Sequence, residues 1–246
     1  NRNKRGITVD FACAQGAEIV RQLARRCDVL VENYKVGDLA RHGLDYATLR
    51  QASPGLVYCS VTGYGQDGPY AARGGFDAVF QAQSGFMHAV GIPDGQGGSL
   101  PHRAPIAAVD LVTGSNAALA IVAALLHRER TGRGQAIDIA LLDCAVAFSS
   151  YAAQQHLVSG EAPVLGVALG PQEVLDCADG PVLLLGTRDP QFLRICAVLE
   201  RPALAEDARF RTGPLRHTHR AALREILVPL VRPWQRQALL ARLGDA

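Results

Sequence analysis

Residues 28–63 read DVLVENYKVGDLARHGLDYATLRQASPGLVYCSVTG. The stretch opens and closes with runs rich in Val, Leu and Tyr, at 28–34 and 55–63, which are typical of buried strands. Between them, residues 45–53 have the spacing of a helix that begins near Asp45. A strand, a helix and a second strand in this order predict a parallel pair, because the helix carries the chain back to the edge where the first strand began.

The same alternation continues on both sides of this stretch. Upstream, the residues predict a short strand at 7–11 and a helix at 17–27. Downstream, they predict a long helix over 110–130, ended by Gly132 or Gly134, and a strand at 135–142. We therefore expect an α/β fold, with a Rossmann-like parallel sheet and helices on its faces.

The pattern of expected elements changes near residue 160. Residues 164–173 read as a loop, and they are followed by a strand at 179–187, a helix at 189–200 and two further helices at 215–230 and 233–244. We expect a large domain at 1–160 and part of a smaller α+β domain at 161–246. The chain opens without Met and stops near a helix end, so we expect an interior piece of a longer protein.

Composition limits the partners. The chain of 246 residues is 48% hydrophobic and 20% charged, which is ordinary for a globular protein. Its net charge of +2 gives no reason to expect nucleic acid or a membrane surface as a partner. The richest apolar run, ALAIVAALL at 118–126, looks too short to cross a bilayer. Six scattered cysteines without a CxxC pair predict free thiols in a reducing compartment, the cytoplasm.

Several kinds of site are not predicted. His217 and His219 stand two apart on an expected helix and have no carboxylate–histidine cluster beside them, so no metal site is expected. The chain has neither a G-x-S-x-G nucleophile elbow nor a phosphate-binding G-x-x-x-x-G-K motif. Gly-rich stretches at 64–75 and 91–101 flank an expected helix at 76–90, and such loops either line sites or merely connect elements.

One carboxylate stands out. Asp110 lies in PIAAVDLVTG, residues 105–114, at the head of the long apolar helix. It is either an N-cap that accepts hydrogen bonds from the first backbone N–H groups, or a reactive carboxylate whose pKa is lowered by the positive end of the helix. Spacing alone leaves both interpretations open.

Four stretches resemble the class III CoA-transferase family, which includes formyl-CoA and carnitine CoA-transferases and the α-methylacyl-CoA racemases. They are NRNKRGITVDF at 1–11, DVLVENYKVGDLARHGLDYATLR at 28–50, LVYCSVTGYGQDGPYAARGGFDAVFQAQSGFM at 56–87, and ALLHRERTGRGQAIDIALLD at 124–143. The segments VTGYGQDGP and DLVTG are most similar to members that handle dicarboxylates, such as succinyl-CoA:glutarate transferases.

The resemblance implies roles for particular residues. Asp110 falls at the position of the family's catalytic aspartate, which attacks an acyl-CoA thioester and passes through a mixed anhydride and an aspartyl-CoA thioester before a carboxylic acid takes the CoA. Neighbouring N–H groups at the helix start could then hold a developing oxyanion. Asp77 matches an acidic position beside this site and is the second expected catalytic residue. The positions matching CoA contacts are Asn33, Tyr34, Arg41 and Arg73, although a strand-end Asn and a solvated Arg are the simpler interpretation.

The resemblance also implies the partners. They are a CoA thioester as substrate, with succinyl-CoA as a candidate donor, and a small carboxylic acid, with no tightly bound cofactor and no metal. Two subunits are expected to interlock as a homodimer.

Two alternatives stay open. The racemases carry His where this chain has Phe76, which favours transfer, but His88 and His102 lie nearby in sequence. A degenerate CoA-binding relative is the other, because Ala12 replaces a family Lys and the loop at 168–174 is shortened.

Overall fold

The computed structural model describes residues 3–93, 99–160 and 170–244. The chain forms two compact units, residues 1–163 and 164–246.

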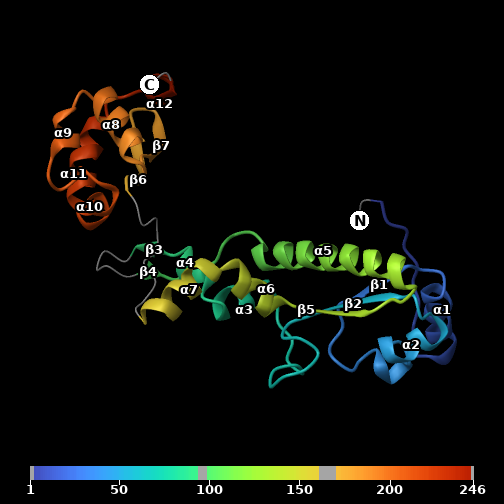
Figure 1. The fold of residues 1–246 in the computed structure, drawn as a ribbon. Helices are drawn as coiled ribbons and strands as arrows, with labels where there is room; N and C mark the ends of the chain where they lie inside the picture. Colours follow the sequence, from blue (N-terminus) through green and yellow to red (C-terminus); the bar gives the residue numbers. More distant parts are fainter. Residues whose placement is uncertain (1–2, 94–98, 161–169, 245–246) are drawn as a thin grey trace. The chain divides into compact units, whose positions relative to one another are not determined.

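A three-stranded parallel sheet is the centre of the first unit. Its strands are β1 (Val29–Glu32), β2 (Val57–Thr62) and β5 (Ala136–Ala140), in the order β1-β2-β5 (Figure 1). The pairing that residues 28–63 predict is therefore confirmed, because β1 and β2 are parallel neighbours. The α/β class is confirmed as well, while the Rossmann-like topology stays a prediction.

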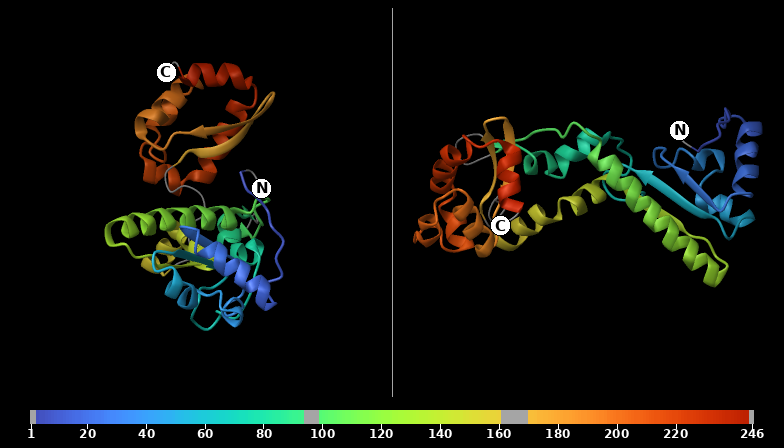
Figure 2. Two further views of the ribbon diagram at one scale, coloured as in Figure 1. Left: turned by 90° about the vertical axis from the view of Figure 1, so that its right-hand side faces the viewer. Right: turned by 90° about the horizontal axis from the view of Figure 1, so that it is seen from above.

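Helices cover both faces of this sheet. The long helix α5 (Ala108–Thr131) packs on one face, where its apolar side meets alternate residues of the strands, namely Val57, Cys59 and Ile137. Helices α1 (Ala14–Ala24) and α2 (Tyr46–Ala52) pack on the other face against Leu30 and Tyr58 (Figures 1 and 2). Burial on both faces explains why the strands read as nearly continuous apolar runs.

The direction of α5 places its first turn at the carboxyl ends of the strands. At its far end, the guanidinium of Arg128 donates to the backbone carbonyls of Asp28 and Gly55, which precede β1 and β2. The helix stops at Gly132, whose φ of 72° is left-handed, as the sequence predicts. Since α5 runs antiparallel to the strands, Asp110 lies at the carboxyl ends of the strands, where α/β proteins commonly bind ligands.

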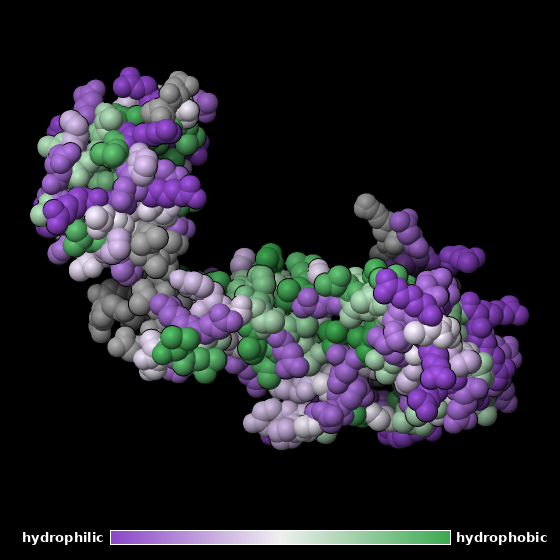
Figure 3. All heavy atoms as spheres, in the orientation of Figure 1, coloured by the Kyte–Doolittle hydropathy of each residue, from purple (hydrophilic) through white to green (hydrophobic). Residues whose placement is uncertain are grey.

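The outer side of α5 is apolar too. Leu111, Leu119, Val122 and Leu126 are each more than half exposed, and Figure 3 shows apolar side chains gathered over this helix. By length and composition, α5 could cross a membrane, so the expectation that no apolar run is long enough was wrong. That is weak evidence for a membrane span, because core helices of globular proteins pass the same test.

Several sequence-based boundaries were also wrong. Residues 7–11 form no strand, because no neighbouring strand pairs with them in the described chain, and Ile7 is 70% exposed. The expected helix at 76–90 breaks at Gly85, whose φ is 78°, into α3 (Asp77–Gln83) and α4 (Phe86–Ala89). The strand expected at 135–142 ends at Ala140, where the next helix begins.

The elements that complete the first unit are short. A 3-10 turn η1 (Ala40–His42) follows β1, and β3 (Ile92–Pro93) pairs antiparallel with β4 (Ser99–Leu100). After β5 come two helices, α6 (Leu141–Phe148) and α7 (Ser150–Ser159).

The second unit is an antiparallel hairpin covered by helices. The hairpin is β6 (Gln172–Cys177) and β7 (Gly180–Leu185), so the interpretation of residues 172 and 173 as loop was wrong. The helices are α8 (Asp189–Val198), α9 (Ala203–Glu206), α10 (Gly213–Thr218), α11 (Arg220–Val231) and α12 (Arg236–Gly244). As the sequence predicts, Pro190 lies in the first turn of α8.

Arg216 holds this unit together at its centre. Its side chain is fully buried and donates to the carbonyls of Gly170 and Phe210 and to the carboxylate of Asp189, 2.7 Å away. The guanidinium also stacks on the ring of Phe192. The helix expected at 215–230 is divided at His219, between α10 and α11. Of the shortened loop at 168–174, Ala168 and Leu169 lie outside the described residues.

Candidate active site

Asp110 is not the cap of its helix. Helix α5 begins at Ala108, so Asp110 is its third residue and its carboxylate is exposed. The N-cap position is Ala107, which has no side chain able to accept a hydrogen bond. The interpretation of Asp110 as an N-cap was therefore wrong.

Asp77 performs the capping from another helix. It is the first residue of α3 and is only 7% exposed. Its Oδ1 accepts the backbone N–H groups of Val109, at 2.8 Å, and Asp110, at 3.1 Å. Two residues that are 33 positions apart in the sequence are thus in direct contact, and the contact fixes the first turn of α5.

The first turn of α5 has no N–H group left for an oxyanion. Asp77 takes two of the four, and the N–H groups of Ala108 and Leu111 donate to the carbonyls of Ile106 and Ala107. The sequence-based hypothesis that these groups stabilise an oxyanion was wrong. A tetrahedral intermediate at Asp110 would need donors from elsewhere.

The pKa of Asp110 is raised above the ordinary value of an aspartate. Although the residue as a whole is exposed, the surrounding chain removes part of the hydration of its carboxylate, and this is the larger cause; the negative charge of Asp77 is the second. The expectation of a lowered pKa was wrong, since Asp77 already compensates the positive end of the helix. A carboxylate next to another carboxylate is less readily ionised, and its ionised form is a stronger base.

Gln81 completes the connection between α3 and α5. It is fully buried, and its Nε2 donates to Oδ2 of Asp77 at 2.5 Å and to the carbonyl of Ile106 at 3.1 Å. Its Oε1 accepts the N–H of Ala104 at 3.1 Å. Sequence reasoning missed this residue. The available signal was its position four residues after Asp77, on the same side of the helix.

Phe80 anchors α3 at the end of β2. Its ring is fully buried, and a Cβ on Gly63 or Gly75 would lie 2.8 or 2.7 Å from the ring Cζ. Any other residue at these two positions would displace the ring. The two glycines therefore allow α3, and with it Asp77, to lie at the carboxyl end of the sheet.

The expected CoA-binding residues are engaged within the protein. Asn33 donates from its amide to the carbonyl of Val61, which joins the end of β1 to β2. Arg41 forms an ion pair with Asp38. Their roles toward CoA stay predictions.

The two other expected CoA-binding residues, Tyr34 and Arg73, each contact an aromatic ring. Tyr34 is about half exposed, and its ring meets Phe11 edge to face with centroids 5.4 Å apart. Arg73 stacks on the ring of Tyr70, 4.0 Å from its centroid. Exposed rings and guanidinium groups are suited to bind a nucleotide. In the described contacts, none of the four expected CoA-binding residues is hydrogen-bonded to Asp77 or Asp110.

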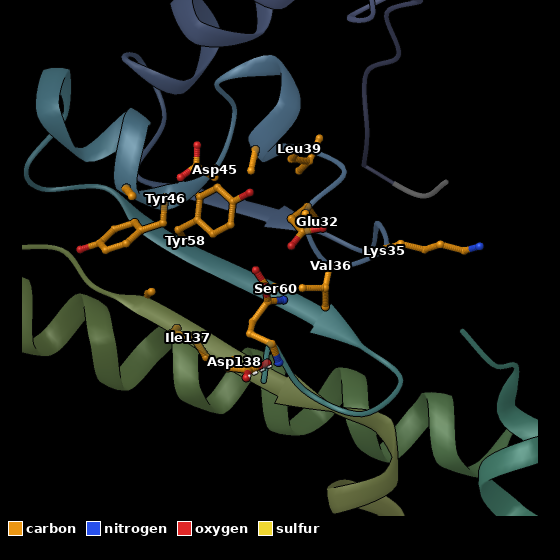
Figure 4. Close-up of a pocket in the computed structure, with 15 residues that line it drawn as sticks. Glu32, Lys35, Val36, Leu39, Asp45, Tyr46, Tyr58, Ser60, Ile137 and Asp138 are labelled. Atoms are coloured by element: carbon orange, nitrogen blue, oxygen red, sulfur yellow. Dashed lines mark hydrogen bonds between the residues drawn. The ribbon is translucent and has the colours of Figure 1, made fainter. Parts of the chain in front are cut away.

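A pocket of about 310 Å³ lies on the sheet face opposite α5 (Figure 4). Glu32, Ser60 and Asp138 form a polar row there, since they are direct neighbours across the three strands. The carboxylate of Glu32 accepts the N–H of Tyr34 at 2.7 Å, and that of Asp138 accepts the N–H of Gln66 at 2.8 Å. Both carboxylates therefore hold the loops that follow β1 and β2. Sequence reasoning missed this row, which only the strand register reveals.

Phe76 directly precedes α3 and is 86% exposed. Ala12 lies in a turn before α1 and donates its N–H to Asp10. His88 lies in α4, and the backbone N–H of His102 donates to the carbonyl of Met87. Among the described residues, no group of three His, Cys, Asp or Glu could hold a metal ion.

Comparison with known proteins gives a consistent result. Residues 1–246 match the model of CoA-transferase family III. The chain is 43% identical over 244 residues to succinate–glutarate CoA-transferase of Agrobacterium fabrum, covering 98% of this chain and 60% of that protein. It is 39% identical over 231 residues to human succinyl-CoA:glutarate CoA-transferase, covering 92% of this chain and 52% of that protein.

A solved structure supports the same assignment. A CAIB/BAIF family protein from Brucella suis superposes with a TM-score of 0.84 at 39% identity, covering all of this chain and 65% of that one. The chain thus spans about half to two thirds of the length of these relatives. A family match over every residue, together with relatives this similar, leads to one conclusion: the chain belongs to CoA-transferase family III.

Proposed function

We propose that the protein of which this chain is part transfers CoA from an acyl-CoA to a carboxylic acid, with Asp110 as the nucleophile. The observation that carries the proposal is the site itself: an exposed carboxylate in the first turn of α5, whose backbone is fixed by Asp77 and whose pKa is raised. The family match over the whole chain supports CoA transfer as the chemistry.

The reaction can be balanced with this one carboxylate. An oxygen of ionised Asp110 attacks the thioester carbonyl, the C–S bond breaks, and a mixed anhydride and a CoA thiolate form. The thiolate attacks the aspartyl carbonyl, which releases the donor acid and leaves an aspartyl-CoA thioester. The acceptor carboxylate then attacks the carbonyl of this thioester, the C–S bond breaks, and a second mixed anhydride, between Asp110 and the acceptor, forms together with the CoA thiolate. The thiolate attacks the acceptor carbonyl of this anhydride, which gives the acceptor-CoA thioester and breaks the bond to the aspartate oxygen. Asp110 is regenerated as the carboxylate.

The raised pKa of Asp110 suits this sequence. A carboxylate that is more basic than an ordinary aspartate is a better nucleophile toward the thioester. The cost is that the carboxylate must be ionised at the working pH in order to attack.

The names of the relatives suggest the substrates. The bacterial and human relatives are named for transfer between succinate and glutarate. We propose succinyl-CoA as the donor and a dicarboxylic acid such as glutarate as the acceptor.

Racemisation of a 2-methylacyl-CoA is the second candidate function. Phe76 disfavours it, because a phenyl ring can neither donate nor accept the α-proton.

The test uses the full-length protein with succinyl-CoA, hydroxylamine and peptide mass spectrometry. We expect a hydroxamate on the peptide that contains Asp110, and no such adduct in Asp110→Asn. The matched control is Asp143→Asn, because Asp143 is also an exposed carboxylate in the third position of a helix. If the parent protein forms no adduct but exchanges the α-proton of a 2-methylacyl-CoA with deuterium, the proposal is wrong and racemisation replaces it.

We further propose a cytoplasmic homodimer. All six cysteines are free, and four of them are buried, which suits a reducing compartment. The exposed apolar side of α5 is a surface that a second subunit could cover. Light scattering of the full-length protein would give twice the monomer mass if this is right, and the monomer mass if it is wrong.

A further inference from the structure

Gln81 uses every polar group that it has. Its amide has two N–H donors and an acceptor oxygen, and the three bonds go to Asp77, to the carbonyl of Ile106 and to the N–H of Ala104. The side chain is fully buried, so its own amide atoms depend on these three partners and not on water. A buried polar residue with this arrangement fixes the groups around it.

Only an amide of this length satisfies all three partners. An ionised carboxylate would lack the two donors, and an apolar side chain would leave Oδ2 of Asp77, the carbonyl of Ile106 and the N–H of Ala104 without this partner. The segment before α5 is thereby attached to α3 at Ala104 and Ile106, on the two sides of Pro105. Those residues lead directly into the first turn of the helix.

Asp77 transmits this constraint to Asp110. Gln81 holds Oδ2 of Asp77, and the other oxygen, Oδ1, accepts the N–H of Asp110. A carboxylate held at both oxygens cannot turn about its Cβ–Cγ bond without breaking a hydrogen bond. The backbone position of Asp110 therefore depends on the amide of Gln81, which lies two contacts away.

We infer that Gln81 is a positioning residue for the nucleophile, acting through Asp77 to hold Asp110 where it can reach a thioester. The inference rests on the proposed function. It assigns to Gln81 an effect on the chemical step, because three of the four expected CoA contacts, Asn33, Tyr34 and Arg41, follow a different strand, β1, and Gln81 contacts none of the four in the described hydrogen bonds. Hydrogen bonding from Gln81 also keeps the charge of Asp77 directed at the start of α5.

The first experiment compares Gln81→Met with the matched control Gln83→Met in the full-length protein. Gln83 lies on the same helix, is exposed, and accepts a hydrogen bond from the hydroxyl of Tyr64. We expect Gln81→Met to lower kcat for CoA transfer about 10- to 100-fold, since a small misplacement of a reacting group has effects of this size. The KM for succinyl-CoA should change less than about twofold, and Gln83→Met should retain the parent kcat.

The second variant, Gln81→Glu, adds a readout that a purely structural role would not give. A protonated carboxylic acid can still donate to Asp77, whereas an ionised one repels it. We expect activity to fall as the pH rises, through an alkaline limb that the parent lacks, while circular dichroism stays unchanged over the same range. A flat alkaline profile in the folded variant would overturn the inference.

Hydrogen exchange separates this inference from the proposed function. In Gln81→Met, the peptide containing Val109 and Asp110 should exchange faster than in the parent and in Gln83→Met, whatever the activity. If the parent transfers CoA but Gln81→Met keeps its kcat and its exchange rate, the inference is wrong and the function stands. If the parent transfers no CoA, the function is wrong, and unchanged exchange in Gln81→Met would refute the positioning as well.

Discussion

Replacing Asp77 tests the central contact of the site. Asp77→Ala removes the acceptor of two backbone N–H groups, and one of these belongs to Val109, which is fully buried. Asp77→Asn keeps an oxygen that can accept the same bonds, but it loses the charge and places an amide against the amide of Gln81.

The magnitudes follow from these contacts. A hydrogen bond to a charged group contributes about 1.5–3 kcal/mol, and removal of a helix cap costs about 0.5–2 kcal/mol. The two N–H groups share one oxygen, so the contributions do not add fully. We expect Asp77→Ala to lower the free energy of unfolding by about 2–3 kcal/mol and Asp77→Asn by about 1 kcal/mol less than that.

The assay is urea unfolding of the full-length protein, with a shift in the midpoint at constant slope as the expected result. The matched control is Asp143→Ala, because Asp143 occupies the third position of α6 and is exposed. We expect the control to change stability by about 0.5 kcal/mol or less. A loss below about 0.5 kcal/mol in Asp77→Ala would refute the reasoning, since it would mean that the capping contact contributes nothing.

Three further predictions concern packing, the second unit and pH. Gly63→Ala should destabilise the protein by about 1–3 kcal/mol in thermal unfolding, because the new Cβ would lie 2.8 Å from the buried ring of Phe80. The control Gly114→Ala should not destabilise it, because its Cβ would meet open space. Arg216→Met should cost about 2–4 kcal/mol in chemical unfolding, because two backbone carbonyls lose their buried donor, whereas the exposed carboxylate of Asp189 can bind water; a loss below about 1 kcal/mol would contradict this. The acid limb of kcat/KM should lie above the ordinary aspartate pKa of about 3.9, because burial and the neighbouring charge favour the protonated form of Asp110, and Asp77→Asn should move that limb to lower pH; an unmoved limb would exclude the charge as a cause.

The sequence by itself determined the parallel sheet and the C-terminal end of its long helix. The apolar runs of β1 and β2, with a helix between them, predict parallel strands. The reason is that the helix carries the chain back to the end of the sheet where the first strand began. Gly132 ends α5 because a glycine readily adopts the left-handed conformation that ends a helix. Both signals are local, so the sequence displays them directly.

The local sequence pattern gave wrong secondary structure where a pairing partner or a backbone conformation decides it. The residues at 7–11 alternate like a strand, but a strand exists only when another strand pairs with it. The first two residues of β6 lie in a stretch that reads as a loop, and its pairing with β7 makes the segment a strand. The break at Gly85 is set by a backbone conformation that helical periodicity does not reveal.

The candidate site shows the same division. The sequence singled out Asp110 and Asp77 by family resemblance, but spacing left open whether Asp110 caps its helix. Only the tertiary structure assigns the cap to Asp77, reveals Gln81 behind it and explains the raised pKa, because residues on α3 and α5 meet there from distant parts of the chain. Hydrogen-bond partners and charge neighbours depend on distance in space, and a linear sequence does not contain that distance.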